Sequence, residues 1–114
     1  MSKVVEVTDQ NFEEEVLRSE VPTEVDFWAP WCRPCMMVSP IYDRLSMEYE
    51  NFKFCKINVD ENLETARRYQ IMSIPMQLFF VNGEKVDDLL GAVPERMIRA
   101  TVEKVIERAT TELP

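Results

Sequence analysis

Strand-like and helix-like segments alternate along almost the whole chain, and this alternation limits the folds that it can adopt. The β-prone or continuously apolar runs lie at residues 3–7, 23–28, 52–59, 77–81 and 84–90. Apolar residues recur every three or four positions, as in helices, at 10–18, after the second cysteine, at 62–69 and after Pro94. The order βαβαβαββα predicts an α/β fold: a central mixed sheet with helices on both faces and an antiparallel edge hairpin.

Residue types at the ends of these segments support the assignment. Thr8 and Asp9 offer capping side chains to the first helix. Pro40 falls inside the second helix and predicts a kink there, because proline removes a backbone donor and crowds the preceding turn. The Asn82-Gly83 pair separates two β-prone runs and predicts a tight hairpin, because both residues tolerate positive φ.

Length and composition set the class of protein. A chain of 114 residues suits one domain, residues 1–114, with a single core. No run approaches the roughly 18 apolar residues of a membrane span. Residues 1–6 reach an acidic side chain before any signal-length apolar stretch develops, which favours the cytosol. The net charge of −8 argues against a nucleic-acid partner, because phosphate binding needs clustered Lys and Arg.

The chain contains no histidine, which excludes Ser-His-Asp and Cys-His catalytic sites and histidine metal ligands. Two of its three cysteines lie in the run Trp31-Cys32-Arg33-Pro34-Cys35, between a predicted strand and a predicted helix. At a helix start, unpaired N–H groups and the helix dipole stabilise a thiolate, which is the nucleophilic form of cysteine. The second cysteine follows one turn later, within reach of a short disulfide, and the intervening proline restricts the backbone.

Three structural alternatives compete with a redox role. A zinc or iron–sulfur site needs more ligands than two neighbouring thiols and a distant Cys55 provide. A purely structural disulfide across three residues gains little entropy, because the loop that it closes is so small. Cys55 itself is expected in the core, and so are the methionines, including Met36 and Met37. The sequence therefore favours a redox-active Cys32–Cys35 pair.

The run from Val25 to Cys35 resembles the active-site segment of the thioredoxin family, which usually has glycine where this chain has Arg33. The resemblance extends in the family's order over essentially the whole chain. It includes Lys56-Ile57-Asn58-Val59-Asp60, Ser73-Ile74-Pro75, Asn82-Gly83 and Leu90-Gly91-Ala92. It implies a thioredoxin fold and reduction of protein disulfides, with Cys32 attacking the target disulfide and Cys35 resolving the mixed disulfide.

The same resemblance implies the partners and the remaining contact residues. No cofactor is bound, and electrons come from a thioredoxin reductase, either an NADPH-dependent flavoprotein or a ferredoxin-linked enzyme. The partners are this reductase and disulfide-containing proteins, and we expect a monomer in the cytoplasm. Pro75 corresponds to the family's cis-proline, and an X-Pro bond is the ordinary place for a cis peptide. The expected substrate-binding residues, around an exposed Cys32 sulfur, are Trp31, Arg33, Pro34, Ile74, Pro75, Gly91 and Ala92.

Two charged residues within predicted strands complete the expected site. Asp26 has apolar neighbours on both sides, where a carboxylate is disfavoured unless it is paired or protonated. Lys56 shares a strand face with Phe52 and Phe54, so its stem should be buried. The resemblance assigns Asp26 as proton acceptor for Cys35 and Lys56 as the residue that tunes it. Burial should raise the pKa of Asp26 toward working pH. A solvent-facing Asp26 is the alternative.

Four positions depart from the family's usual pattern, and they leave alternatives open. Arg33 adds a positive charge beside Cys32, whereas Met36 replaces a frequent Lys, so the two changes partly offset. Ser73 and Met76 stand where Gly and Thr are common, which bears on partner choice. Arg33 mildly supports a disulfide oxidant or isomerase with a raised potential. A soft-metal carrier for Cu or Zn and an interaction module with incidental thiols are further alternatives.

Overall fold

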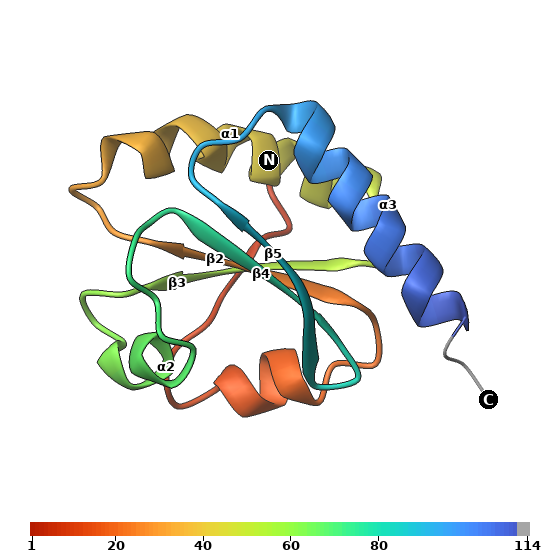
Figure 1. Cartoon of the computed structure of the whole chain (residues 1–114), viewed down its shortest axis with the longest axis horizontal. Helices are drawn as coiled ribbons and strands as arrows, with labels where there is room; N and C mark the ends of the chain where they lie inside the picture. Colours follow the sequence, from red (N-terminus) through yellow and green to blue (C-terminus); the bar gives the residue numbers. More distant parts are fainter. Residues whose placement is uncertain (112–114) are drawn as a thin grey trace.

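A five-stranded mixed sheet forms the centre of the computed structural model, which describes residues 1–111 (Figure 1). The strand order across the sheet is β1-β3-β2-β4-β5, and β2 pairs parallel with β3 and antiparallel with β4. The strands are β1 (Val5–Glu6), β2 (Thr23–Trp28), β3 (Lys53–Asn58), β4 (Met76–Val81) and β5 (Glu84–Leu90). The expected α/β architecture with a mixed sheet is therefore confirmed, and β2 occupies its middle.

Helices cover both faces of this sheet, as the strand–helix alternation predicts. In Figure 1, α1 (Arg33–Glu48) and α3 (Glu95–Thr111) lie above it, whereas α2 (Leu63–Arg68) and the π-helical segment η1 (Glu13–Leu17) lie below. Each face has its own apolar cluster. The cluster under α1 and α3 includes Val38, Leu45, Phe54, Phe79, Ile98 and Val102. The cluster on the opposite face includes Phe12, Val16, Val25, Phe27, Ile57 and Phe80.

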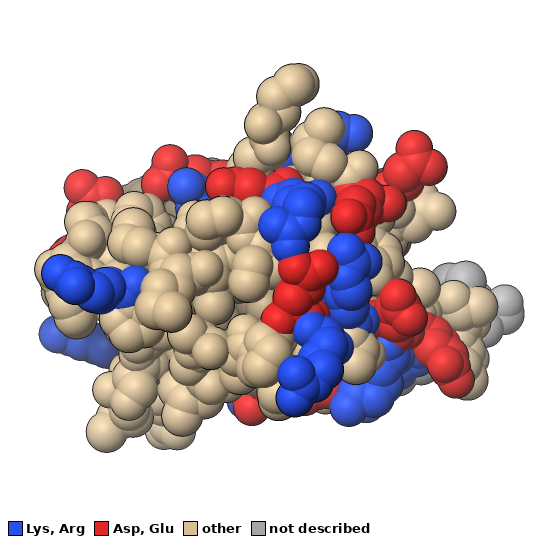
Figure 2. Space-filling view, turned by 90° about the horizontal axis from the view of Figure 1, so that it is seen from above, with Lys and Arg blue, Asp and Glu red and all other residues tan. Residues whose placement is uncertain are grey.

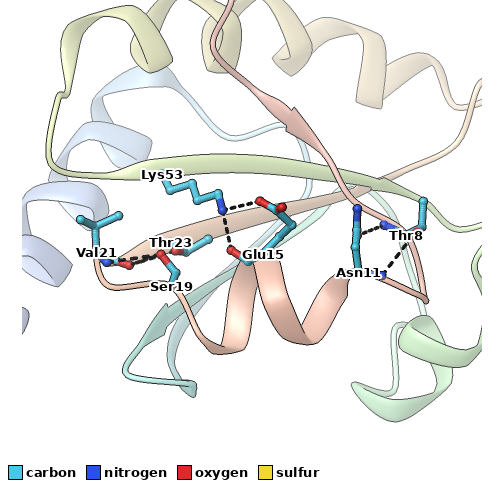
Figure 3. Close-up of polar contacts among 7 residues, drawn as sticks. All are labelled: Thr8, Asn11, Glu15, Ser19, Val21, Thr23 and Lys53. Atoms are coloured by element: carbon cyan, nitrogen blue, oxygen red, sulfur yellow. Dashed lines mark hydrogen bonds and ion pairs between the residues drawn. The ribbon is translucent and has the colours of Figure 1, made fainter.

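The first helix differs from its expected form. We expected a helix over 10–18 capped by Thr8 and Asp9, but only η1 forms there, without a side-chain cap. Thr8 and Asn11 instead bond each other reciprocally: the Thr8 N–H donates to Asn11 Oδ1 (2.7 Å) and the Asn11 N–H to Thr8 Oγ1 (3.3 Å) (Figure 3). Asp9 does cap a helix, but a distant one, since it accepts the Thr65 N–H of α2 at 2.9 Å.

A partly buried ion pair ties η1 to the sheet. Lys53 Nζ donates to both the backbone oxygen and the carboxylate of Glu15, each at 2.7 Å (Figure 3). At the entry to β2, Ser19 Oγ and Thr23 Oγ1 both donate to the carbonyl oxygen of Val21, at 2.9 and 3.0 Å. These contacts hold the segment that leads into β2, the strand that carries Asp26.

The hairpin prediction is confirmed, but the expectation for the methionines is wrong. Asn82 and Gly83 adopt φ of 51° and 81° between β4 and β5. Met36 and Met37 are 42% and 66% exposed. Cys35 and Val38, three residues apart, occupy the buried face of α1 at this point, which leaves the two methionines between them on the outer face. Helix α1 continues through Pro40 to Glu48.

Charged side chains of both signs alternate over the face formed by α1 and α3, as Figure 2 shows. Arg99 joins the two helices, since it pairs with Glu48 of α1 at 2.7 Å and with Glu95 of its own helix at 2.9 Å. Arg44 also pairs with Glu95. In Figure 2, the left half of this face is mostly uncharged, with a few Lys or Arg side chains at its left end.

Among residues 1–111, no helix is both long and apolar enough to cross a bilayer.

Candidate redox site

The cysteine pair lies where β2 leads into α1. Cys32 is the N-cap of the helix, with extended backbone (φ −89°, ψ 105°), and Pro34 lies in the first turn. Cys32 and Cys35 form a disulfide with a Cα–Cα distance of 5.3 Å. The Cys35 N–H donates to Cys32 Sγ at 3.2 Å. The sulfur of Cys32 therefore occupies the anion-binding position at a helix start, where N–H groups and the helix dipole favour a thiolate.

Both cysteines are buried, but to slightly different extents. Cys32 retains 4% exposure and Cys35 1%, and both pack with Ala29. The expected exposed sulfur is thus largely covered, because Ile74 approaches it: Cys32 Sγ lies 3.8 Å from the Ile74 carbonyl oxygen. Trp31, directly before Cys32, is 70% exposed. Of the two cysteines, Cys32 is the more accessible from outside.

Two further loops meet beside the cysteine pair. The Ile74–Pro75 peptide bond is cis, as expected for this position. The Gly91 N–H donates to the Pro75 carbonyl oxygen at 2.8 Å, which holds the loop containing Gly91 and Ala92 against the loop containing Pro75. Gly91 has φ of 89°, a conformation that favours glycine. The predicted contact residues in these two loops are therefore brought together.

A shallow apolar groove extends from Trp31 away from the disulfide. It encloses about 420 Å³, and its lining comprises Trp31, Val59, Ala66, Ile71, Met72, Ser73 and Ile74. The Trp31 indole N–H donates to both carboxylate oxygens of Asp60, at 3.0 and 3.2 Å, which orients the ring over this groove. Asp60 was not among the residues expected at the site. Arg33 and Pro34 are exposed but do not line the groove.

Asp26 lies on the inner side of the cysteine pair. It is 5% exposed, so the solvent-facing alternative is excluded. A small cavity of about 160 Å³ connects it with Cys35, and its lining comprises Asp26, Trp28, Cys35, Met36, Ser39 and Lys56. Asp26 and Cys35 therefore line the same small cavity.

The electrostatic surroundings of Asp26 suit a proton acceptor. Burial raises its pKa to about 7, and the neighbouring Gln77 side chain and the Lys56 ammonium oppose this rise. Lys56 and Gln77 are the register partners of Asp26 in β3 and β4. Lys56 Nζ also lies 5.4 Å from the centre of the Trp28 ring. A carboxyl with a pKa near neutrality exchanges its proton readily at working pH.

Three polar neighbours of Asp26 were missed by sequence reasoning. Glu24, Tyr42 and Gln77 are buried, and their side-chain polar atoms lack hydrogen-bond partners among the described residues. Glu24 carried a usable signal, because it lies two residues before Asp26 in the same buried strand and so shares its face. Tyr42 and Gln77 reach the site only through the tertiary arrangement of α1 and β4.

Cys55 takes no part in this site. It is 1% exposed and packs on the opposite face of the sheet, with Val25 and Ile57. Burial is the main reason that its pKa is raised to about 12, so its thiol is not ionised near neutrality. Within residues 1–111, no three Cys, Asp or Glu side chains are grouped so that they could hold a metal ion.

Comparisons with known proteins agree with this geometry. The family model described as Thioredoxin matches residues 3–104. Thioredoxin 1 of Nostoc sp. is 50% identical over 105 residues, which cover 91% of this chain and 98% of the relative. A thioredoxin of Synechocystis sp. is 49% identical over 107 residues, covering 93% of this chain and 100% of the relative. Thioredoxin M4, chloroplastic, of Arabidopsis thaliana is 48% identical over 111 residues, covering 96% of this chain and 55% of the relative.

The family implies disulfide-containing targets and reduction by a thioredoxin reductase. A cysteine pair at disulfide distance at the start of α1 supplies the two thiols that this chemistry needs. The chain belongs to the thioredoxin family and is a thiol–disulfide oxidoreductase of the protein-disulfide reductase type.

Proposed function

We propose that Cys32 is the attacking thiolate, that Cys35 is the resolving thiol and that Asp26 accepts the proton of Cys35. A single observation carries this assignment: one cysteine is the more accessible from outside, and the other faces the buried carboxyl. Cys32 is the N-cap of α1 and the more accessible sulfur, whereas Cys35 faces the cavity that Asp26 lines. The outer cysteine can therefore meet a target, and the inner one can lose its proton to a buried base.

The exchange proceeds in two steps. The Cys32 thiolate attacks one sulfur of the target disulfide, so a mixed disulfide forms and one target thiolate leaves. Asp26 then takes the proton of Cys35, and the Cys35 thiolate attacks Cys32 Sγ. This step re-forms the Cys32–Cys35 disulfide and releases the second target thiolate. Two electrons pass from the cysteine pair to the target, and no bound cofactor is required.

The surface around Cys32 suits an extended target segment. Trp31, Ile74, Pro75, Gly91 and Ala92 supply its apolar contacts, and the Ile74 backbone pairs with the target chain. Support comes from the groove beside Trp31 and from the Gly91–Pro75 hydrogen bond, which holds the two loops together. Arg33 and Pro34 form the exposed rim on the α1 side.

Lys56 acts in this scheme as a tuning residue for Asp26, and both residues line the same cavity. The protein acts as a single-domain monomer in the cytoplasm and receives electrons from an NADPH-dependent flavoprotein reductase or a ferredoxin-linked one. The chloroplastic name of the Arabidopsis relative makes an organelle the competing compartment. A coupled insulin-reduction assay with each reductase in turn distinguishes the two electron sources.

Trapping of mixed disulfides tests the assignment of the two cysteines. Cys35→Ser should accumulate covalent complexes with target proteins, because the first step proceeds and the second cannot. Cys32→Ser should trap none. Cys55→Ser, a matched substitution of the buried third cysteine, should behave as the wild type. Equal trapping by the Cys32 and Cys35 variants would refute the assignment of the nucleophile.

A further inference from the structure

A second buried carboxyl lies on the strand that carries Asp26. Glu24 precedes Asp26 by two residues on β2, and residues two apart in a strand share a face. Glu24 is fully buried (0% exposed), and neither of its carboxylate oxygens has a hydrogen-bond partner in the described part of the chain. Two carboxyls therefore lie side by side beneath α1.

The surroundings of Glu24 are apolar on most sides. Its register partners are Phe54 in β3 and Phe79 in β4. Helix α3 contributes Ile98, Val102 and Val105 to the apolar cluster that contains these two rings. From α1 comes Tyr42, whose buried hydroxyl has no partner among residues 1–111 and whose pKa is raised by burial and then by the charges of Glu24 and Asp26.

The nearby lysines lie opposite or pair with carboxylates other than Glu24. Lys56 is the register partner of Asp26, not of Glu24. Lys53 is paired with Glu15, on the other side of the sheet. Asp87 of β5, opposite Phe79, pairs with Lys104 of α3. Glu24 thus faces an acid, a phenol and aromatic rings.

The different surroundings of Glu24 and Asp26 set the order in which the two carboxyls ionise. An ionised, unpaired carboxylate in apolar surroundings is strongly disfavoured. Burial raises the pKa of Glu24 well above its ordinary value, and the charge of Asp26 raises it further. Asp26 adjoins the cavity and Lys56, so its proton leaves first.

We propose that Glu24 and Asp26 form a coupled pair of buried carboxyls, in which Glu24 keeps its proton and supports the ionised form of Asp26. The inference deepens the proposed function and rests on Asp26 as the proton acceptor. A neutral carboxyl adds no second negative charge beside Asp26, and its dipole stabilises a neighbouring carboxylate better than a hydrocarbon does. In such pairs the first proton leaves more easily and the second less easily than from either group alone. Glu24 is thus a positioning residue for the base of the reaction.

Carbon-13 titration of the side-chain carboxyls in the wild-type protein measures the pair directly. With Glu24 Cδ and Asp26 Cγ assigned, we expect Asp26 to titrate near neutrality while Glu24 keeps the chemical shift of a protonated carboxyl. The Glu24 resonance should make a small step together with Asp26, and its own titration should follow at a more alkaline pH. Ionisation of Glu24 before Asp26, or no step in common, overturns the proposal.

Two variants test the consequence for the reaction. In Glu24→Leu, the midpoint of the rise of insulin-reduction rate with pH should move up by about one pH unit, because the polar neighbour is lost. Glu24→Gln keeps a neutral polar group of the same size and should retain the wild-type midpoint. Thr23→Val alters the adjacent buried residue, whose side chain lies on the other face of β2, and should also leave it unchanged. An unmoved midpoint in Glu24→Leu overturns the proposal.

The role of Asp26 is tested separately. Asp26→Asn should remove the part of the pH-dependent rise that follows the ionisation of Asp26, and only the part that follows the ionisation of the thiols should remain. If the profile of Asp26→Asn matches that of the wild type, the proposed function of Asp26 fails, whereas the coupling of the two carboxyls still stands or falls with the carbon-13 titration.

Discussion

Asp26 and Lys56 lie directly opposite each other in the parallel pairing of β2 with β3, and both line the cavity below Cys35. The pairing places a cation beside a carboxyl whose pKa is raised by burial. Lys56 and Gln77 both oppose the effect of burial, and the resulting pKa of Asp26 is about 7. The pKa of the proposed base thus depends on the register of three strands.

Replacing Lys56 should shift the activity profile toward alkaline pH. In Lys56→Met the cation is lost and the pKa of Asp26 rises, so we expect the midpoint of the pH–rate profile to increase by about one unit or less. Lys53→Met is the matched control, because Lys53 lies on the same strand but pairs with Glu15 on the other face. Insulin-reduction rates between pH 5 and 9 provide the measurement. If the midpoint of the pH–rate profile is unchanged in Lys56→Met, or shifts equally in both variants, Lys56 does not tune Asp26.

Asp26→Asn should stabilise the protein, and the gain should grow with pH. The folded protein holds the Asp26 proton up to about pH 7, whereas the unfolded chain releases it near the ordinary value of 3.8. Wild-type stability therefore falls relative to the variant as pH rises from about 4 to 7, by roughly 4 kcal/mol for a shift of about three units. Urea unfolding at pH 4, 5.5, 7 and 8 measures this difference. A gain that is the same at all four pH values would mean that the charge of Asp26 is not its source.

Much of the fold was predictable because strong local signals agree with the tertiary structure. The bounds 23–28 and 84–90 of two strands were predicted as observed, since β-branched or apolar runs there end at turn residues. Asn82 and Gly83 adopt the positive φ that their residue types favour. The Cys32–Cys35 site was predictable for the same reason: a short motif carries it, and the helix that positions it starts within the motif.

What escaped prediction depends on contacts between distant segments. Asp9 was assigned as a cap by its residue type, but its partner Thr65 lies 56 residues away. Met36 and Met37 were assigned to the core by their apolarity, although helical phase turns them outward. Glu24 was overlooked because glutamate in a strand usually marks an exposed position, and only the helices above it make the site buried.

Arg33→Gly should make the redox potential more negative. Arg33 follows the N-cap cysteine, and its positive charge favours the Cys32 thiolate, which stabilises the reduced form. Because Arg33 is exposed, solvent screens this effect. A change of one pKa unit corresponds to about 30 mV, so we expect a decrease of at most about 30 mV. Equilibration with glutathione redox buffers measures the potential, and Arg33→Lys, which keeps the charge, should remain near the wild-type value. A wild-type potential equal to or below that of Arg33→Gly would remove the support for oxidising behaviour.

Alanine substitutions at Gly83 and Gly91 distinguish a loss of stability from obstruction of the proposed target-binding surface. Both residues have positive φ, 81° at Gly83 and 89° at Gly91, so alanine costs about 1–2 kcal/mol at either position. At Gly83 the added Cβ would also lie 2.9 Å from the Leu17 carbonyl oxygen, whereas at Gly91 it meets nothing within 4 Å. Gly83→Ala should therefore lower the urea midpoint more than Gly91→Ala, with unchanged m-values.

Activity should follow the opposite order. Gly91 adjoins Pro75 at the proposed target surface, so a methyl group there should raise KM for a protein disulfide while kcat changes little. Gly83 lies in the hairpin turn between β4 and β5, and Gly83→Ala should retain the wild-type KM at temperatures where it stays folded. If Gly91→Ala leaves KM unchanged, the contact surface does not extend from Pro75 to the loop containing Gly91 and Ala92.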